Sequence, residues 1–421
     1  MKKVMKTKHV LLIIMGFGLF LSCQDDFENS EKKDDSVISK AVFSGYVQKG
    51  PFINGSSVTI SELDENLDQT GKTYFTTIAN NLGSFEKKNI ELISNYVALK
   101  ADGYYFNEIS GETSTGQITL YALVDMEDMN SANVNVLTHL ERARVEYLVQ
   151  QESLSFAEAK QQARKEVMAI FGFSIPEATI FESLDLTSDA ALLAISCILQ
   201  GSFSTGDMAE LMADIITDIR NDGILDNADL KIKLIDNAIS MSFSTIRDNM
   251  TSKYAELGMN VSIPDFQSYV KLFIENNVDP TAVITYPKTG MYGINILSDE
   301  VTSVTKMSGG EMSPFYSMAA DVPIGMSLKI VMKNGPKLDT SGSWCPWWGP
   351  HLNWQEGQLV NDHVNQWQEF TATSRKPNDL KLGFQSRKVD DDLQYITVEY
   401  YENGSITPTK IKRIYLEEPE S

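Results

Sequence analysis

The chain has 421 residues, and its 57 acidic side chains outnumber its 36 lysines and arginines, for a formal net charge of −21. Such an excess of negative charge repels phosphates at long range, so we expect no nucleic acid partner and no adhesion of the protein body to an anionic membrane surface. The length exceeds what one ordinary hydrophobic core serves and predicts two or three domains.

Residues 1–22 have the composition of a secretory signal peptide. The lysine-rich start MKKVMKTKH precedes the apolar run VLLIIMGFGLFL, which is too short to span a bilayer comfortably. The run ends in FLSC, which resembles a bacterial lipobox, although Phe20 stands where leucine is more usual. The resemblance implies that Cys23 is acylated, becomes the first residue of the mature protein and holds it on a membrane.

Residues 23–40 predict a flexible acidic tether. The stretch QDDFENSEKKDD has too few apolar side chains to pack. It also resembles the surface-export signal of lipoproteins in the Bacteroidetes, which implies a position on the outer face of the outer membrane. A tether without such an address is the alternative.

Residues 41–127 predict a small β-sandwich. Short alternating runs are separated by glycines. The runs are VFSGYVQKG, SSVTISELD, KTYFTTIA, NYVALKADG and GQITLYALV. The segments GYVQKGPFINGSSVTI and NYVALKADGYY, with an Asn-x-x-Gly-x-Phe turn between Asn80 and Phe85, resemble the carboxypeptidase-regulatory or transthyretin-like domains. That resemblance implies a non-catalytic spacer or binding module.

Residues 128–280 predict an all-α helical bundle. Ser155 with Glu158, and Ser204 with Asp207, have the spacing of capping residues at the start of two apolar-striped helices. Other helices are expected in NVNVLTHLERARVEYLVQQ, SDAALLAISCILQG, ADLKIKLIDNAISMSFSTIRDNMTSKYAELG and IPDFQSYVKLFIENN. Each is apolar on one face, so the faces must pack on one another.

Residues 285–418 predict a C-terminal β-sandwich or jelly roll, with a hairpin at Asn403-Gly404. The long loop in its middle contains four of the five tryptophans. An indole face can stack on a sugar ring while neighbouring polar groups bind its hydroxyls. The predicted ligand-binding residues are Trp344, Trp347, Trp348, Trp354, His351 and Asn353. Two alternatives stay open: the indoles anchor the loop in the core, or they form a protein-binding hot spot.

Catalytic motifs are scarce. Beyond the signal segment the histidines are His139, His351 and His363, and the chain contains no HExxH, GxSxG, Walker loop or CxxC motif. We therefore expect no catalytic residues and no cofactor. A carboxylate pair for glycoside cleavage leaves no local signature, so a polysaccharide-active enzyme stays a lesser alternative.

The stretch DIRNDGILDNAD is a weak calcium candidate, with Asp218, Asp222 and Asp226 near the spacing of oxygen ligands. Arg220 stands where a carboxylate is required, so a turn between two helices, with Gly223 ending the first, is the favoured interpretation. A disulfide between Cys197 and Cys345 is less favoured than a buried helical thiol and a loop thiol.

The sequence as a whole predicts a surface-exposed, lipid-anchored outer-membrane protein that binds polysaccharide without catalysis. The alternative is an accessory or adhesin-like protein that docks to an outer-membrane protein partner.

Overall fold

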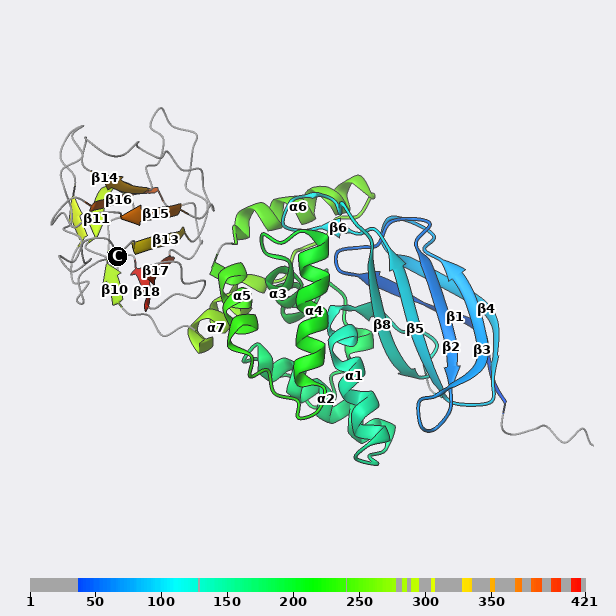
Figure 1. Ribbon diagram of the computed structural model, residues 1–421. Helices are drawn as coiled ribbons and strands as arrows, with labels where there is room; N and C mark the ends of the chain where they lie inside the picture. Colours follow the sequence, from blue (N-terminus) through cyan, green and yellow to red (C-terminus); the bar gives the residue numbers. More distant parts are fainter. Residues whose placement is uncertain are drawn as a thin grey trace, which may run out of the picture.

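The computed structural model describes residues 37–127, 129–239 and 241–277, together with the backbone of short strands between residues 282 and 417. Within it, a β-sheet region is followed by a helical region (Figure 1). Both predictions of secondary-structure type are thereby confirmed.

Two sheets form the β region, in the orders β4-β1-β9 and β3-β2-β5-β8, beside a short β6-β7 pair. The pairs are antiparallel except β1 with β9. The strands are β1 (Ile38–Gln48), β2 (Ser57–Leu63), β3 (Gln69–Thr77), β4 (Ser84–Leu92), β5 (Tyr96–Gly103), β6 (Phe106–Asn107), β7 (Glu112–Thr113), β8 (Ile118–Asp125) and β9 (Val134–Asn135).

Strand β4 is absent from the strands expected from the sequence. It is an edge strand rich in polar residues, and Asn89, at φ 55°, interrupts the alternation of its side chains. Its pairing with β1 depends on residues 38 to 54 positions earlier in the chain, from Tyr46 with Ser84 to Ile38 with Leu92, which local alternation does not report. Strand β1 also begins at Ile38 and not at Ala41, so it includes the last residues of the expected tether.

Seven α-helices and one 3-10 turn follow within the described residues up to 277. They are α1 (Val136–Gln150), α2 (Phe156–Ile170), η1 (Phe181–Ser183), α3 (Ala190–Gln200), α4 (Thr205–Ile219), α5 (Ala228–Ile239), α6 (Phe243–Glu256) and α7 (Phe266–Asn277). Both predicted capping boxes, at Ser155 and Ser204, are present. The single helix expected from ADLK to AELG is wrong: it divides into α5 and α6, because Ser242 caps a new helix through Thr245 N–H.

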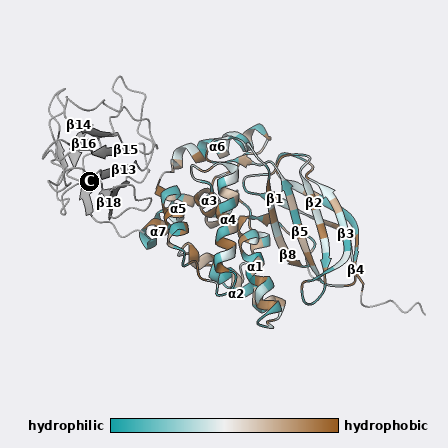
Figure 2. Cartoon of the chain, in the orientation of Figure 1, coloured by the Kyte–Doolittle hydropathy of each residue, from teal (hydrophilic) through white to brown (hydrophobic). Residues whose placement is uncertain are grey.

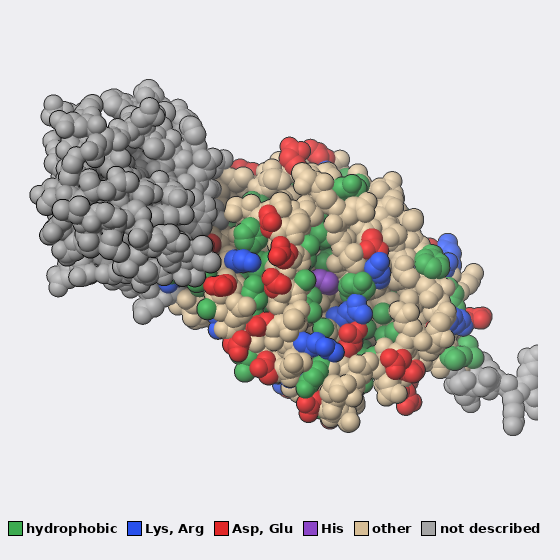
Figure 3. Space-filling model, viewed as in Figure 1, with side chains coloured by type: hydrophobic (Ala, Val, Ile, Leu, Met, Phe, Trp, Pro, Cys, Tyr) green, Lys and Arg blue, Asp and Glu red, His purple; other side chains and the backbone are tan. Residues whose placement is uncertain are grey.

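One buried apolar cluster runs through both regions, from Phe43 on β1 to Ile274 on α7. Helix α1 packs against β8, and α3, which is buried on all sides, contacts α1, α4, α5 and α7 (Figure 2). Acidic and basic side chains are intermixed over the face of the helices seen in Figure 3. The secondary structure therefore changes near residue 128, while the hydrophobic core continues across that point.

The remaining strands form a five-stranded sheet, β10-β18-β17-β13-β15, and a four-stranded sheet, β12-β11-β16-β14. They are β10 (Ala282–Thr285), β11 (Thr289–Ile294), β12 (Val304–Lys306), β13 (Leu328–Asn334), β14 (Gly349–Leu352), β15 (Gln368–Ala372), β16 (Leu380–Arg387), β17 (Tyr395–Glu402) and β18 (Lys410–Glu417). None of the helices in the described part of the chain combines the length and apolarity needed to cross a bilayer.

Candidate functional site

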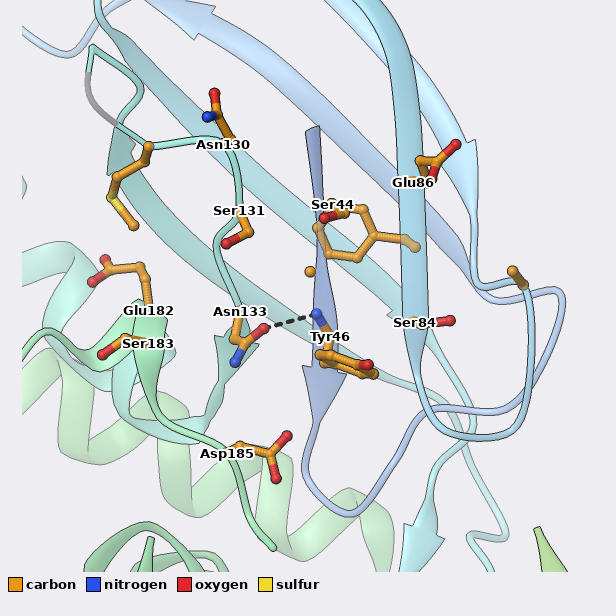
Figure 4. A pocket seen from close by; sticks show the side chains of 14 residues that line it. Ser44, Tyr46, Ser84, Glu86, Asn130, Ser131, Asn133, Glu182, Ser183 and Asp185 are labelled. Carbon is orange, nitrogen blue, oxygen red and sulfur yellow. Dashed lines mark hydrogen bonds between the residues drawn. The ribbon is translucent and has the colours of Figure 1, made fainter. Parts of the chain in front are cut away.

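A groove of about 940 Å³ runs along β1 (Figure 4). Strand β1 and the start of β4 form one side of it, and the segments around residues 129–133 and 182–185 form the other. The side chains that Figure 4 labels around it are Ser44, Tyr46, Ser84, Glu86, Asn130, Ser131, Asn133, Glu182, Ser183 and Asp185. We call it the β1 groove.

The groove exists because β1 is incompletely paired on one edge. β4 pairs along most of β1, whereas β9 pairs only with Val47 and Gln48, and a single bridge joins Ser44 to Ser131. Gly45 permits the close approach there, because a Cβ at this position would lie 1.9 Å from the Ala132 carbonyl oxygen. A glycine in the strand thus lets the next segment run against β1.

Asn133 fixes the wall of the groove. Its Oδ1 accepts a hydrogen bond from Tyr46 N–H at 2.9 Å, and its Nδ2 donates to the Leu184 carbonyl at 2.9 Å. Its own N–H donates to the Glu182 carbonyl at 2.7 Å. One side chain therefore ties β1 to both segments of the opposite side.

Asp185 also connects the two sides of the groove through hydrogen bonds. Its Oδ2 accepts from Gln48 Nε2 at 2.7 Å, and Gln48 Oε1 accepts from Leu186 N–H at 3.1 Å. Oδ1 of Asp185 accepts hydrogen bonds from the N–H and the hydroxyl of Thr187. This carboxylate holds the groove in shape.

Tyr46 provides the aromatic surface of the groove, and it is 41% exposed. Figure 4 shows the Tyr46 ring between Asn133 and Ser84. Ser44 lies further along β1, and Glu86 lies further along β4. An exposed ring surrounded by hydroxyl and amide groups suits a ligand that has both apolar faces and hydrogen-bonding groups.

Behind the groove lies a buried ionic cluster of Lys160, Glu141 and Glu182. Lys160 Nζ contacts Oε1 of both glutamates and donates to the Leu123 carbonyl at 3.1 Å. Burial raises the pKa of Glu141 to about 8 despite the attraction of Lys160, and repulsion from Glu182 adds to the rise. Glu182 links the cluster to the groove, since its carboxylate points away from Tyr46 (Figure 4) and its backbone holds Asn133.

A second buried ion pair, Lys49–Glu108, joins the β region to α3. The pair is 2.6 Å long and fully buried, and Glu108 Oε1 accepts from Gly50 N–H and the Ser196 hydroxyl. The pKa of Lys49 is raised overall. Burial by itself lowers this pKa, but the charge of Glu108, with smaller effects of Tyr105 and Cys197, outweighs burial. The adjacent Cys197 is a buried free thiol whose pKa is raised well above its usual value by burial.

The residues predicted to bind ligand fall in the C-terminal part of the chain. Trp344, Trp347, Trp348, Trp354 and Asn353 lie outside the described residues, as do Cys23 and Cys345. His351 lies on β14, where its backbone pairs with that of Lys381. The hypothesis that the tryptophans bind a ligand therefore stays a prediction from the sequence.

The calcium candidate is a turn after α4. Asp218 Oδ2 accepts from the N–H groups of Asp226 and Asn227, and Asp222 Oδ1 accepts from Ile224 N–H. Gly223, at φ 76°, donates to the Ile219 carbonyl. The part of the chain that the structure describes contains no group of three His, Cys, Asp or Glu side chains placed to hold a metal.

Sequence reasoning missed both the groove and the Lys160 cluster. The groove required knowing that β1 and β4 pair and that residues 129–133 and 182–185 lie beside them. The cluster left a faint trace, because Lys160 interrupts the apolar stripe of Ala159, Ala163 and Val167 on α2. A lysine beside such a stripe more often packs its apolar stem on the stripe and keeps its charged ammonium group in water.

No protein-family model matches the chain, and neither the curated proteins nor the solved structures compared with it contain a match.

Proposed function

We propose that this protein is a lipid-anchored protein of a bacterial outer surface that binds a glycan without catalysis. The observation that carries the proposal is the β1 groove, where the exposed Tyr46 ring is surrounded by serine hydroxyls and asparagine amides. Sugars present apolar C–H faces and hydroxyl groups, so one ligand class uses both kinds of surface.

The rigidity of the groove favours binding. Asn133 and Asp185 hold its two sides together through hydrogen bonds, so little conformational entropy is lost when a ligand enters. Its volume of about 940 Å³ lies near the upper end of the range of about 300–1,000 Å³ found for ligand pockets.

The C-terminal tryptophans offer a second contact for the same ligand class. Trp347 and Trp348 precede β14 directly and Trp354 follows it closely, with His351 on the strand itself. We propose that the two C-terminal sheets form a sandwich or jelly roll that displays this window, and that the N-terminal sheets are a transthyretin-like module. The lysine-rich start, the apolar run and Cys23 support attachment through lipid to the outer membrane.

The experiment measures binding of the full chain, in detergent, to a panel of neutral and acidic polysaccharides by calorimetry and by tryptophan fluorescence with iodide quenching. Tyr46→Ala tests the groove, and the double variant Trp344→Ala/Trp347→Ala tests the C-terminal window. Phe75→Ala is the matched control, because Phe75 is a 69% exposed aromatic residue on β3 and does not line the groove.

We expect Tyr46→Ala to weaken glycan binding at least tenfold without lowering the melting temperature, and Phe75→Ala to leave binding unchanged. Equal binding by Tyr46→Ala and the parent protein would remove the groove from the proposal. Absence of binding to every polysaccharide in the panel would count against a glycan ligand and favour a protein partner on the outer membrane. Release of sugar products would replace binding with catalysis.

A further inference from the structure

The cluster of Lys160, Glu141 and Glu182 places an amine between two carboxyl groups and away from solvent. The side chains are 6%, 1% and 2% exposed. They come from three elements: Lys160 from α2, Glu141 from α1 and Glu182 from η1. The core holds the three reactive groups in contact.

The charges of this cluster favour one proton arrangement. Two carboxylates and one ammonium would leave a net negative charge in the core, which is strongly unfavourable. The cluster is neutral when one carboxyl keeps its proton, in agreement with the raised pKa of Glu141. At neutral pH the core then contains a carboxylic acid, an ammonium ion and a carboxylate side by side.

Each of the two carboxyl groups also has one oxygen without a hydrogen-bond partner among the described residues. Oε1 of Glu141 and Oε1 of Glu182 contact Lys160, whereas Oε2 of both is buried without a hydrogen-bond partner among the described residues. A buried oxygen without a partner is unfavourable. Loss of one oxygen from Glu141 would remove one of the two.

We infer that Lys160 and Glu141 form an intramolecular amide bond, with Glu182 carrying the protons. The Lys160 ammonium gives a proton to the Glu182 carboxylate, and the free amine then attacks the carboxyl carbon of Glu141. A C–N bond forms and the C–OH bond breaks. Glu182 protonates the departing hydroxyl and takes the second amine proton, so one water leaves and Glu182 ends as a neutral acid.

The product suits its surroundings better than the reactants do. Atoms and charge balance, since a neutral cluster becomes an amide, a carboxylic acid and water, and no formal charge stays in the core. The amide N–H keeps the Leu123 carbonyl as its acceptor. The bond links α1 to α2 across nineteen residues of chain without using a cysteine.

The Lys49–Glu108 pair is an internal control for this inference. It is as deeply buried, but both oxygens of Glu108 have partners: Lys49 on Oε2, and Gly50 N–H and the Ser196 hydroxyl on Oε1. The ion pair of Lys49 involves one carboxylate, that of Glu108, whereas Lys160 contacts two. The Lys49 pair therefore has no second carboxylate to carry protons. We expect this pair to stay ionic.

The test is a tryptic digest of the full, denatured protein, read by tandem mass spectrometry. Trypsin cannot cut after an acylated lysine, so we expect a branched peptide that joins residues 101–142 to residues 145–164 and is one water lighter than its two parts. A linear peptide of residues 145–160, with a free Lys160 at its end, would overturn the inference. A branch at Glu182 would overturn the assignment of the acceptor.

Intact mass alone does not decide, because ring closure at Asp222-Gly223 also removes one water. The fragment ions must therefore place the branch on Lys160. Lys160→Arg keeps the cation and abolishes the branched peptide. Glu182→Gln keeps the shape and removes the proton carrier, so we expect at least a tenfold smaller branched fraction in protein whose circular dichroism matches the parent. An undiminished branch in folded Glu182→Gln protein would rule out its role as carrier.

Discussion

At the scale of the residue, His139 is a group on α1 whose charge the fold suppresses. Its ring stacks on Tyr121 with 5.8 Å between centroids, and its Nδ1 is buried without a hydrogen-bond partner among the described residues. Burial, and then repulsion from Arg142, lower the pKa of His139 from 6.5 to about 4.

The suppressed charge of His139 makes stability depend on pH. The unfolded chain binds a proton near pH 6.5 and the folded chain only near pH 4, so stability falls as the pH drops through that window. The full effect is roughly 3 kcal/mol in the free energy of unfolding. His139→Phe keeps the stacking and should flatten this part of the profile, as measured by urea unfolding at pH 7 and pH 4.5. An unchanged slope would contradict the shift.

Gly45 sets the distance between β1 and the wall of the groove. Gly45→Ala places a methyl group against the Ala132 carbonyl, where backbone must move, and we expect a loss of roughly 1–3 kcal/mol from overpacking. Gly206→Ala is the control, because its Cβ would meet only the Ser204 hydroxyl at 3.8 Å. Thermal denaturation of both variants should separate them; equal stability would show that the close approach at Gly45 carries no strain.

At the scale of the element, the starts of helices were the most predictable features. Ser155 and Glu158 bind each other's backbone N–H groups, a motif that four consecutive residues contain in full. The strand β4 and the break between α5 and α6 were missed, since one depends on a distant partner strand and the other on a cap within an apolar stretch.

Loss of the Ser155 cap has a defined cost. Ser155→Ala leaves the Glu158 N–H without its acceptor and should lower the free energy of unfolding by about 1 kcal/mol. Ser252→Ala, at an exposed position inside α6, should leave stability unchanged or slightly raise it. Chemical denaturation of the two variants compares the cap with ordinary helix propensity, and a neutral Ser155→Ala would mean that water replaces the cap fully.

At the scale of the whole molecule, the β region and the helical region share a core and a buried ion pair. Lys49 lies after β1, Glu108 after β6 and Ser196 on α3, so their hydrogen bonds cross the boundary between the two regions. We therefore expect residues 37–277 to unfold as one unit, with the amides of β2 and α3 exchanging at the same global free energy.

Removing one partner of this pair tests the shared core. Glu108→Ala leaves the Lys49 ammonium buried and unpaired and should destabilise both regions together by about 3–5 kcal/mol. Glu86→Ala, which breaks the exposed Lys88–Glu86 pair, should cost only about 0–1 kcal/mol. Hydrogen exchange followed by mass spectrometry reads both regions; destabilisation of the β strands alone would show two independent units.

The sequence by itself determined the features that neighbouring residues encode: a lysine-rich, apolar start, the change from alternating strands to striped helices, and the helix caps. These patterns arise from backbone geometry and local hydrogen bonds, and so they can be recognised in short windows. Only the tertiary structure decided the β1 groove and the Lys160 cluster. Asn133 bonds to Tyr46 across 87 positions, and Lys160 meets Glu182 across 22, because a folded core brings together groups whose proximity no local pattern records.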